Sequence, residues 1–170
     1  MVYMQTWDRA NRLALVTTGG VTMTFGYDAA GALAVKTVAT TNTVTPTHYL
    51  GGYYERTVGG AARRYYLLGD QLVLYDGTAY HYLYGDHLNS ATLTTDAAGT
   101  KTSETRYFPY GAHRYDWGSD PSDRDFTGQR RDVEIALLDY VARRYSHLLR
   151  NSLGHWMNDT LVRTGIFVKH

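Results

Sequence analysis

The chain has 170 residues, with 17 lysines and arginines against 16 acidic residues, and no cysteine. This length can bury one hydrophobic core, and a formal net charge of +1 gives no field that would attract nucleic acid or an anionic membrane. The lack of cysteine excludes a disulfide framework and a thiolate metal site. With 16 tyrosines, 17 glycines and only 3 prolines, the composition favours strands and turns over helices.

Short strands separated by turns are predicted up to about residue 115. Alternating or β-branched runs predict strands at residues 12–17, 21–27, 32–39, 63–68, 78–84 and 102–108. Glycine and aspartate turn signals stand between such runs at residues 19–20, 28–31, 51–52, 59–60, 69–70, 76–77 and 96–99. This spacing is typical of consecutive antiparallel hairpins, not of strands joined by crossover helices.

One turn element occurs twice in the sequence. The tetrapeptide Asp-Ala-Ala-Gly stands at residues 28–31 and again at residues 96–99, each time between two predicted strands. Aspartate can accept a hydrogen bond from its own backbone two residues on, and glycine can take the left-handed conformation that closes such a loop. An aromatic residue directly before an aspartate also recurs, as in Tyr27-Asp28 and Tyr115-Asp116. This recurrence indicates a repeat protein.

The C-terminal third has a different character. Residues 130–150 contain few turn formers and place apolar residues near one helical face, with Asp132 and Glu134 at the start and Arg150 at the end. Taken locally, this pattern predicts a helix. The following residues, 151–170, give no assignment.

Several passages in order resemble the YD-repeat and RHS-core family. Residues 7–13 (WDRANRL) and 24–31 (TFGYDAAG) are similar to one YD repeat. Residues 82–90 (YLYGDHLNS) resemble the D-H-L-G-S signature, and residues 106–111 (RYFPYG) resemble R-Y-x-P-Y/F-G. Residues 126–129 (FTGQ), followed by residues 137–145, resemble the F-T-G-Q … L-Y-D-Y-x-A-R-Y-Y block. The resemblance therefore extends from about residue 7 to residue 145.

The resemblance implies an all-β fold in which antiparallel YD-repeat hairpins form a sheet that is part of a spiralling shell, whose end the core block closes. It implies a hairpin at residues 132–150, where local propensity leaves a short helix open. The expected regions are 1–120 for the YD-repeat hairpins, 121–150 for the core-like segment and 151–170 for a divergent tail. The positions that match the family motifs are expected to hold the fold together. They are Trp7, Tyr27, Asp28, Gly31, Asp86, His87, Asp96, Gly99, Tyr107, Pro109, Gly111, Gly128, Tyr140 and Arg143.

Departures from the family pattern set limits on this expectation. Asn89, Ala136 and Val141 stand where glycine is common in the family. The usual continuation of the core block is degraded after residue 145, and Asp159 is followed by Thr160 instead of proline. Self-cleavage by the family mechanism is therefore not expected, and the chain is interpreted as a truncated member or a remnant of a longer gene.

Other patterns were weighed as candidate chemistry. His81, Asp86 and His87 lie close enough in sequence to suggest a metal site, and Asp86, His87 and Ser90 suggest a hydrolase triad. Turn structure explains both groups equally well, and a triad is seldom formed by neighbours in sequence. The glycine pairs at 51–52 and 59–60 predict hairpin turns, not phosphate loops. We therefore predict no catalytic residue, no metal and no cofactor.

The arginines and the tyrosines are the residue classes that could contact a partner. The arginines at 130, 131, 143, 144 and 150 are interpreted as a solvated surface, and the tyrosines as sheet packing. Exposed tyrosines that stack on sugars would instead give a carbohydrate-binding, adhesin-like module. A third alternative is a self-cleaving peptidase core.

The leading hypothesis is a non-enzymatic structural or encapsulating module of a bacterial toxin-delivery or cell-surface protein. Its expected partners are upstream YD repeats or other copies, through open strand edges. The chain shows no signal-peptide pattern and no apolar run long enough for a membrane span. The family resemblance suggests a secreted or cell-surface location.

Overall fold

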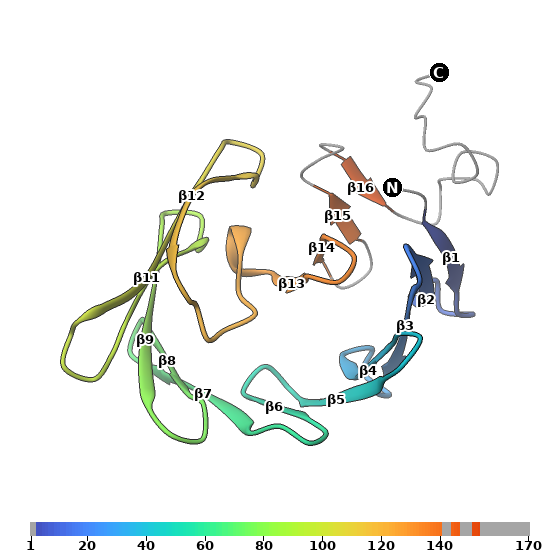
Figure 1. Cartoon of the computed structure of the whole chain (residues 1–170), viewed down its shortest axis with the longest axis horizontal. Helices are drawn as coiled ribbons and strands as arrows, with labels where there is room; N and C mark the ends of the chain where they lie inside the picture. Colours follow the sequence, from blue (N-terminus) through green and yellow to red (C-terminus); the bar gives the residue numbers. More distant parts are fainter. Residues whose placement is uncertain (1–2, 141–143, 147–150, 154–170) are drawn as a thin grey trace.

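The computed structural model describes residues 3–140, 144–146 and 151–153, which form two antiparallel sheets (Figure 1). In the larger sheet twelve strands each pair with the next strand in the sequence. We call this sheet the wall. It bends into an open arc whose two ends, β1 and β12, do not pair with each other (Figure 1). The strands of the wall are β1 (Met4–Trp7), β2 (Leu13–Thr18), β3 (Val21–Tyr27), β4 (Leu33–Ala39), β5 (Val44–Leu50), β6 (Tyr54–Thr57), β7 (Ala62–Leu68), β8 (Gln71–Tyr75), β9 (Tyr80–Gly85), β10 (Ala91–Thr95), β11 (Lys101–Tyr107) and β12 (His113–Gly118).

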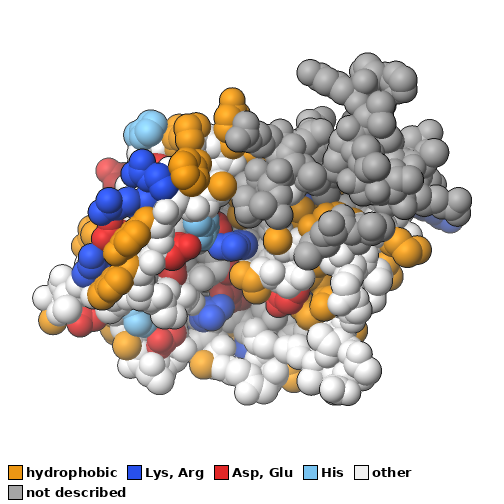
Figure 2. All heavy atoms as spheres, turned by 45° about the horizontal axis from the view of Figure 1, so that its top comes forward, with side chains coloured by type: hydrophobic (Ala, Val, Ile, Leu, Met, Phe, Trp, Pro, Cys, Tyr) orange, Lys and Arg blue, Asp and Glu red, His pale blue; other side chains and the backbone are white. Residues whose placement is uncertain are grey.

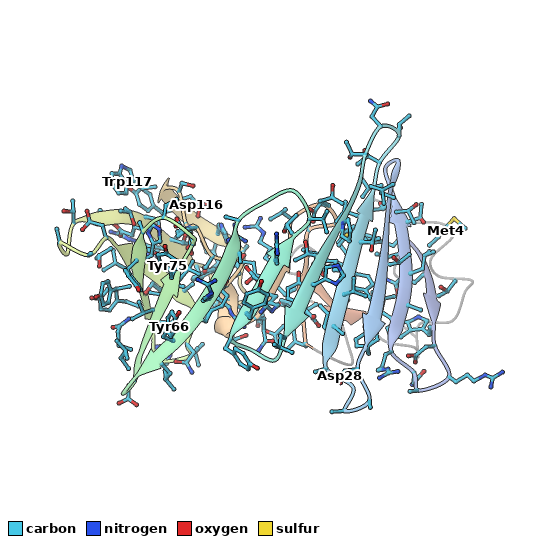
Figure 3. The ribbon with its side chains drawn as sticks, turned by 90° about the horizontal axis from the view of Figure 1, so that it is seen from below. Met4, Asp28, Tyr66, Tyr75, Asp116 and Trp117 are labelled. Carbon is cyan, nitrogen blue, oxygen red and sulfur yellow. The ribbon has the colours of Figure 1, made fainter. Side chains whose placement is uncertain are left out.

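The expected all-β fold of antiparallel hairpins is confirmed. The six strand ranges predicted from the alternating pattern correspond to β2, β3, β4, β7, β9 and β11, with ends that differ by at most two residues. Because every connection in the wall is a hairpin, the loops alternate between the two ends of the strands. The loop with Asp28 lies at one of these ends (Figure 3). Among the described residues, no helix is long and apolar enough to cross a bilayer.

The same five-residue loop occurs five times in the wall, at residues 8–12, 28–32, 86–90, 96–100 and 108–112. In each loop the first backbone N–H donates to the fifth carbonyl, and the fourth N–H donates to the first carbonyl, over 2.8–3.1 Å. The fourth residue has a positive φ between 62° and 85°. A register shift accompanies each of these loops in the adjoining strands. The loops are therefore hairpin turns with a bulge, which increases the local twist of the sheet.

This loop geometry explains the residues that recur in the sequence. In four of the loops an aspartate comes first, and its Oδ1 accepts from the backbone N–H of the fifth residue, as Asp96 does from Thr100 over 2.8 Å. The positive φ of the fourth residue favours glycine, and asparagine tolerates it better than most other residues. Asn89, at a position where the family has glycine, meets this requirement with a φ of 62°.

The smaller sheet contains β13 (Arg130–Asp132), β14 (Leu137–Asp139), β15 (Arg144–Ser146) and β16 (Asn151–Leu153). The helix predicted locally for residues 130–150 is therefore wrong for the described residues of that range, and the hairpin implied by the resemblance is correct. Ala136, with a φ of 53°, helps to turn the chain between β13 and β14. Residues 141–143 and 147–150 lie outside the described residues.

The main hydrophobic core lies between the two sheets. Ile135, in the turn between β13 and β14, and Leu137 of β14 pack against Leu13, Val16 and Met23 of the wall. All five side chains are almost completely buried. Burial of an aliphatic side chain of this size contributes about 1.5–3 kcal/mol. A second cluster, formed by Tyr65, Leu74 and Leu83, lies under β7–β9. Leu137, one of the apolar residues that suggested a helical face, thus packs on the concave side of the wall, whereas Val133 is exposed.

Candidate functional site at the junction of wall and plug

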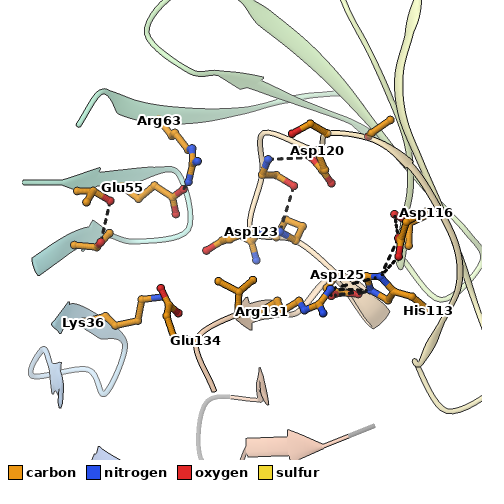
Figure 4. Close-up of a pocket in the computed structure, with 18 of the residues that line it drawn as sticks. Lys36, Glu55, Arg63, His113, Asp116, Asp120, Asp123, Asp125, Arg131 and Glu134 are labelled. Atoms are coloured by element: carbon orange, nitrogen blue, oxygen red, sulfur yellow. Dashed lines mark hydrogen bonds and ion pairs between the residues drawn. The ribbon is translucent and has the colours of Figure 1, made fainter. Parts of the chain in front are cut away.

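After β12 the chain turns into the concave side of the wall. We call residues 119–140 the plug; they contain a short 3₁₀ helix, η1 (Phe126–Gly128), followed by β13 and β14. A cleft of about 650 Å³ lies between the plug and the wall, and is lined by β4–β7 on one side and β11–β12 on the other (Figure 4). Acidic and basic side chains meet in this hollow (Figure 2).

The first charged group centres on Arg130 of β13. Its Nη1 donates to Glu55 Oε2 of β6 and to Asp123 Oδ2 of the plug, the latter over 2.5 Å. Its guanidinium lies over the ring of Tyr49, 4.6 Å from the ring centre. Arg63 of β7 contacts the other Glu55 oxygen at 3.1 Å. Burial alone would lower the pKa of Arg130, but Asp123 and Glu55 raise it above its usual value, so the guanidinium stays charged.

The second group joins the smaller sheet to β3 and β4. Lys36 of β4 donates to Asp132 Oδ1 over 2.9 Å, and Arg144 approaches the other Asp132 oxygen at 3.5 Å. Arg144 is fully buried, also pairs with Asp139, and lies 4.7 Å from the centre of the Phe25 ring. Burial alone would lower the pKa of Lys36, yet Asp132 raises it. These charges are therefore buried in pairs, as a low-dielectric site requires.

The third group is centred on His113 at the start of β12. Its Nδ1 lies 2.9 Å from Asp116 Oδ1, and its Nε2 lies 3.0 Å from Asp125 Oδ1 of the plug (Figure 4). Arg131 contacts Asp125 at 3.2 Å. The hydrogen bond that Asp125 accepts from the His113 ring is the largest cause that raises the pKa of His113. Burial alone would raise the pKa of Asp125, but His113 and Arg131 lower it. His113 thus links the wall to the plug.

The sequence analysis did not predict most of the residues in these three charged groups. Glu55, Lys36 and His113 stand in separate strands, and no spacing connects them with the plug. The alternation of acids and arginines at residues 120–125 is a signal that could have been noticed. The arginines at 130 and 144 were interpreted as solvated, which is wrong, because both side chains are buried in ion pairs. Arg130 pairs with Glu55 of the distant β6, whereas Arg144 pairs with Asp132 and Asp139 of its own sheet.

The residues that match the family motifs are spread over the wall and its contact with the plug. Asp28, Gly31, Asp86, Asp96, Gly99, Pro109 and Gly111 lie in the recurring loops. Tyr27 donates to the Leu13 carbonyl and Tyr107 to the Ala91 carbonyl, so each tyrosine bonds a neighbouring hairpin. Trp7 packs against the main core. Arg143 lies outside the described residues.

Three of these motif positions meet where the plug touches the wall. Gly128, with a φ of 70°, brings the plug so close to the loop at 86–90 that a Cβ would lie 3.1 Å from the Asn89 carbonyl oxygen. The Tyr140 hydroxyl lies 2.5 Å from Thr127 Oγ1. Tyr107 packs on Phe126, with ring centres 5.7 Å apart. Tyr107 and Tyr140 thus both contact η1, which ends at Gly128.

The structure places Asp86, His87 and Ser90 in one recurring loop, where the Ser90 backbone N–H donates to Asp86 Oδ1 over 2.8 Å. His87 is exposed, whereas Ser90 is fully buried and its Oγ accepts from the Thr127 N–H over 3.1 Å. His81 contacts Asp76 at 2.9 Å. Within the part of the chain that the structure describes, no three histidine, aspartate or glutamate side chains come together as a set of metal ligands. The geometry at the junction is that of a docking interface made of ion pairs.

Solved structures with a similar fold include Tc toxin chains. A Tc holotoxin pore from Photorhabdus luminescens matches 93% of this chain with a TM-score of 0.77, at 18% identity. Two TcdB2–TccC3 structures match 89% of it with TM-scores of 0.71 and 0.75, also at 18% identity. The chain shares the fold of these toxin chains. It spans only 9% of their length. No protein-family model matches the sequence, and no curated protein matches it.

Proposed function

We propose that this chain is a structural, encapsulating module of an RHS/YD-repeat protein of the bacterial toxin-delivery or cell-surface class, without catalytic activity of its own. In this proposal residues 1–120 form the hairpin wall, residues 121–150 form the core-like segment that closes it from inside, and residues 151–170 form a divergent tail. Its partners are further hairpin repeats, or toxin chains, that extend the wall at β1 or β12.

The observation that carries the proposal is the docking of the plug on the concave face. The wall curves into an open arc, and the plug, which follows β12, lies on the concave side of that arc. Buried ion pairs from three separate regions of the wall hold the segment in place. A buried pair contributes little net stability over an apolar pair, but it fixes one relative position of the two partners. Such a junction suits a wall that must be closed at a defined place.

Two further observations support the family assignment within this proposal. The motifs at residues 7–31, 82–111 and 126–145 resemble YD repeats and the RHS core in their order. The fold is that of about a tenth of each solved Tc toxin chain. A module of this size would therefore work as one part of a longer wall.

The replacement Arg130→Met tests the closure. We expect trypsin to cleave the variant after Arg124 much faster than the wild-type chain, because Glu55 and Asp123 lose their shared partner. Breaking a buried pair by removal of one partner costs roughly 3–5 kcal/mol. Native-condition proteolysis followed by mass spectrometry measures the rate and the site of cleavage.

Arg114→Met is the matched control, since Arg114 is an exposed arginine of β12. Its plug should stay as protected as in the wild type, and far-UV circular dichroism should show the same sheet content in all three proteins. Equal protection of residue 124 in the Arg130 variant would contradict the proposed closure. Without protease, the intact mass should stay at the full-length value for days; spontaneous cleavage would favour a peptidase core instead.

A further inference from the structure

The two ends of the wall differ in their surface. The loops after β5, β7, β9 and β11 all lie at one end, because every strand reverses direction. Seven large apolar side chains are about half exposed or more in these loops or at the strand ends beside them. Six of them, Leu50, Tyr53, Leu67, Leu68, Leu88 and Phe108, are called the apolar rim; the seventh is Tyr110.

The apolar rim is continuous over its first two loops. Leu50, Tyr53, Leu67 and Leu68 line one shallow groove across β5–β7. Leu67 and Leu68 are adjacent in the sequence, so their side chains point to opposite faces of β7, yet they are 71% and 63% exposed. The end of this hairpin therefore presents apolar surface on both faces. Single exposed apolar residues are ordinary, but a contiguous patch marks an interaction site.

The opposite end of the wall lacks such a patch among the described residues. Its exposed large apolar residues include Met4, Val44, Val58, Tyr80 and Trp117, each at a different strand end or loop. Its turns are made of small or polar residues, such as Gly19-Gly20 and the threonines at 40–43. The residues of the apolar rim, which make this difference, lie in loops and strand ends of the wall and belong neither to the plug nor to β1 or β12.

Charge and area indicate what covers the apolar rim. Residues 51–53 and 108–112 carry no charged side chain, and the loops between them carry only Asp70, Asp86 and His87. The exposed Arg64 of β7 also lines the groove of Leu50, Tyr53, Leu67 and Leu68. Few cations means little attraction to an anionic membrane, whereas the core of a protein interface is depleted of charge. The six side chains expose on the order of 600 Å² per chain, the lower bound for one side of a specific protein interface.

We infer that the apolar rim is a self-association surface that receives the apolar rim of a second copy of this chain. In a two-fold arrangement, each patch meets itself and every contact is made twice. Asp70 and His87 are both exposed and lie on neighbouring loops of this end. A two-fold axis between these loops places Asp70 of each copy opposite His87 of the other. The small area makes this dimer dissociate at micromolar concentration.

Sedimentation velocity from about 1 to about 200 µM tests this inference on the full chain, since a small interface dissociates in that range. The rim variant carries Leu67→Lys and Leu68→Lys. The matched control carries Val44→Lys and Val58→Lys, which are 69% and 56% exposed at the opposite end. We expect a reversible monomer–dimer equilibrium in the wild type and the control, and a dissociation constant raised more than about tenfold in the rim variant.

Circular dichroism of the variants checks that the sheet is retained, and an Asp70→Lys variant gives a second measurement that leaves the apolar side chains in place. Weaker dimerisation of Asp70→Lys supports the two-fold arrangement. A wild-type chain that is monomeric at every concentration overturns the inference. So does a dimer of unchanged affinity in the rim variant, which would place self-association at the strand edges. Co-sedimentation of the monomer with phosphatidylcholine vesicles would assign the apolar rim to a lipid surface instead.

Discussion

Backbone conformation at single residues determines where this chain can turn. The fourth position of the recurring loop has a positive φ in all five cases, and glycine or asparagine occupies it each time. Ala136 and Thr127 also have a φ of 53°, although neither residue type favours the left-handed region. Both lie in the plug. The wall therefore uses residues suited to its turns, whereas the plug includes two that carry a conformational cost.

Ala136→Gly should stabilise the protein. An L-residue other than glycine is destabilised by roughly 1–2 kcal/mol in the left-handed region, and glycine removes this strain. Glycine is also more flexible in the unfolded chain, which offsets about 0.5–1 kcal/mol of the gain in stability. A net gain of about 0.5–1 kcal/mol in the free energy of unfolding is expected. Urea denaturation followed by circular dichroism measures it.

The control for this change is Ala62→Gly in β7, where the backbone is extended. There the replacement should lower the free energy of unfolding by about 0.5–1 kcal/mol, because glycine loses more backbone entropy on folding than alanine and the extended backbone has no strain to relieve. A loss of stability of that size in Ala136→Gly as well would show that the positive φ at residue 136 carries no cost.

At the scale of elements, the wall is a series of similar hairpins. The strands follow the alternation of residues, and the aspartate loops set their register through backbone hydrogen bonds. The main failure of local reasoning was at residues 130–150. Val133, Leu137 and Tyr140 repeat at helical spacing, but Ile135 and Leu137 gain more by packing against the wall than a helix would gain from propensity alone. Tertiary contacts decided this element.

Asp96→Ala should weaken the hairpin between β10 and β11. Asp96 Oδ1 accepts hydrogen bonds from the backbone N–H groups of Ala98 and Thr100, over 2.9 and 2.8 Å. Loss of such a cap costs roughly 1 kcal/mol at a solvent-exposed position. Asp96→Asn keeps an acceptor oxygen and should recover most of this loss. Urea midpoints of the three proteins give the comparison; equal losses in both variants would mean that charge, not the hydrogen bonds, stabilises the loop.

At the scale of the whole molecule, stability depends on the junction between wall and plug. The two have separate sheets, and the ion pairs of Arg130, Lys36 and His113 connect them. Most of these pairs join charges that persist across the neutral range. His113 differs, because an imidazole loses its charge near neutral pH. The junction therefore has one contact that depends on pH.

The protein should lose stability as the pH rises above neutrality. His113 has a folded-state pKa raised above its usual value near 6.5, mainly by Asp125, with Asp116 adding to it and Arg131 opposing it. Its contribution is complete below pH about 6.5 and disappears as the pH rises through the folded-state pKa. The nearby Tyr107 does not titrate in this window, because burial raises its pKa further above 10.

Melting temperatures between about pH 5.5 and pH 8.5 measure this effect in the wild type and in His113→Gln, which has no titrating ring. The wild type should melt at a progressively lower temperature as the pH rises, and the variant should be nearly independent of pH in this window. Parallel curves for the two proteins would exclude His113 as the source. The control His87→Gln, at an exposed loop position, should behave like the wild type.

The sequence by itself determined the hairpins of this protein, because strand alternation and turn chemistry act between residues that are close in the chain. Tyr27-Asp28 through Gly31 and the second Asp-Ala-Ala-Gly turn are examples, since their bonds span no more than four residues. Only the tertiary structure decided the strand at residues 137–139, the burial of Arg130 and Arg144, and the pairing of His113 with Asp125. Those features depend on contacts between the concave wall and the plug, and such contacts form only when the sheet has curved.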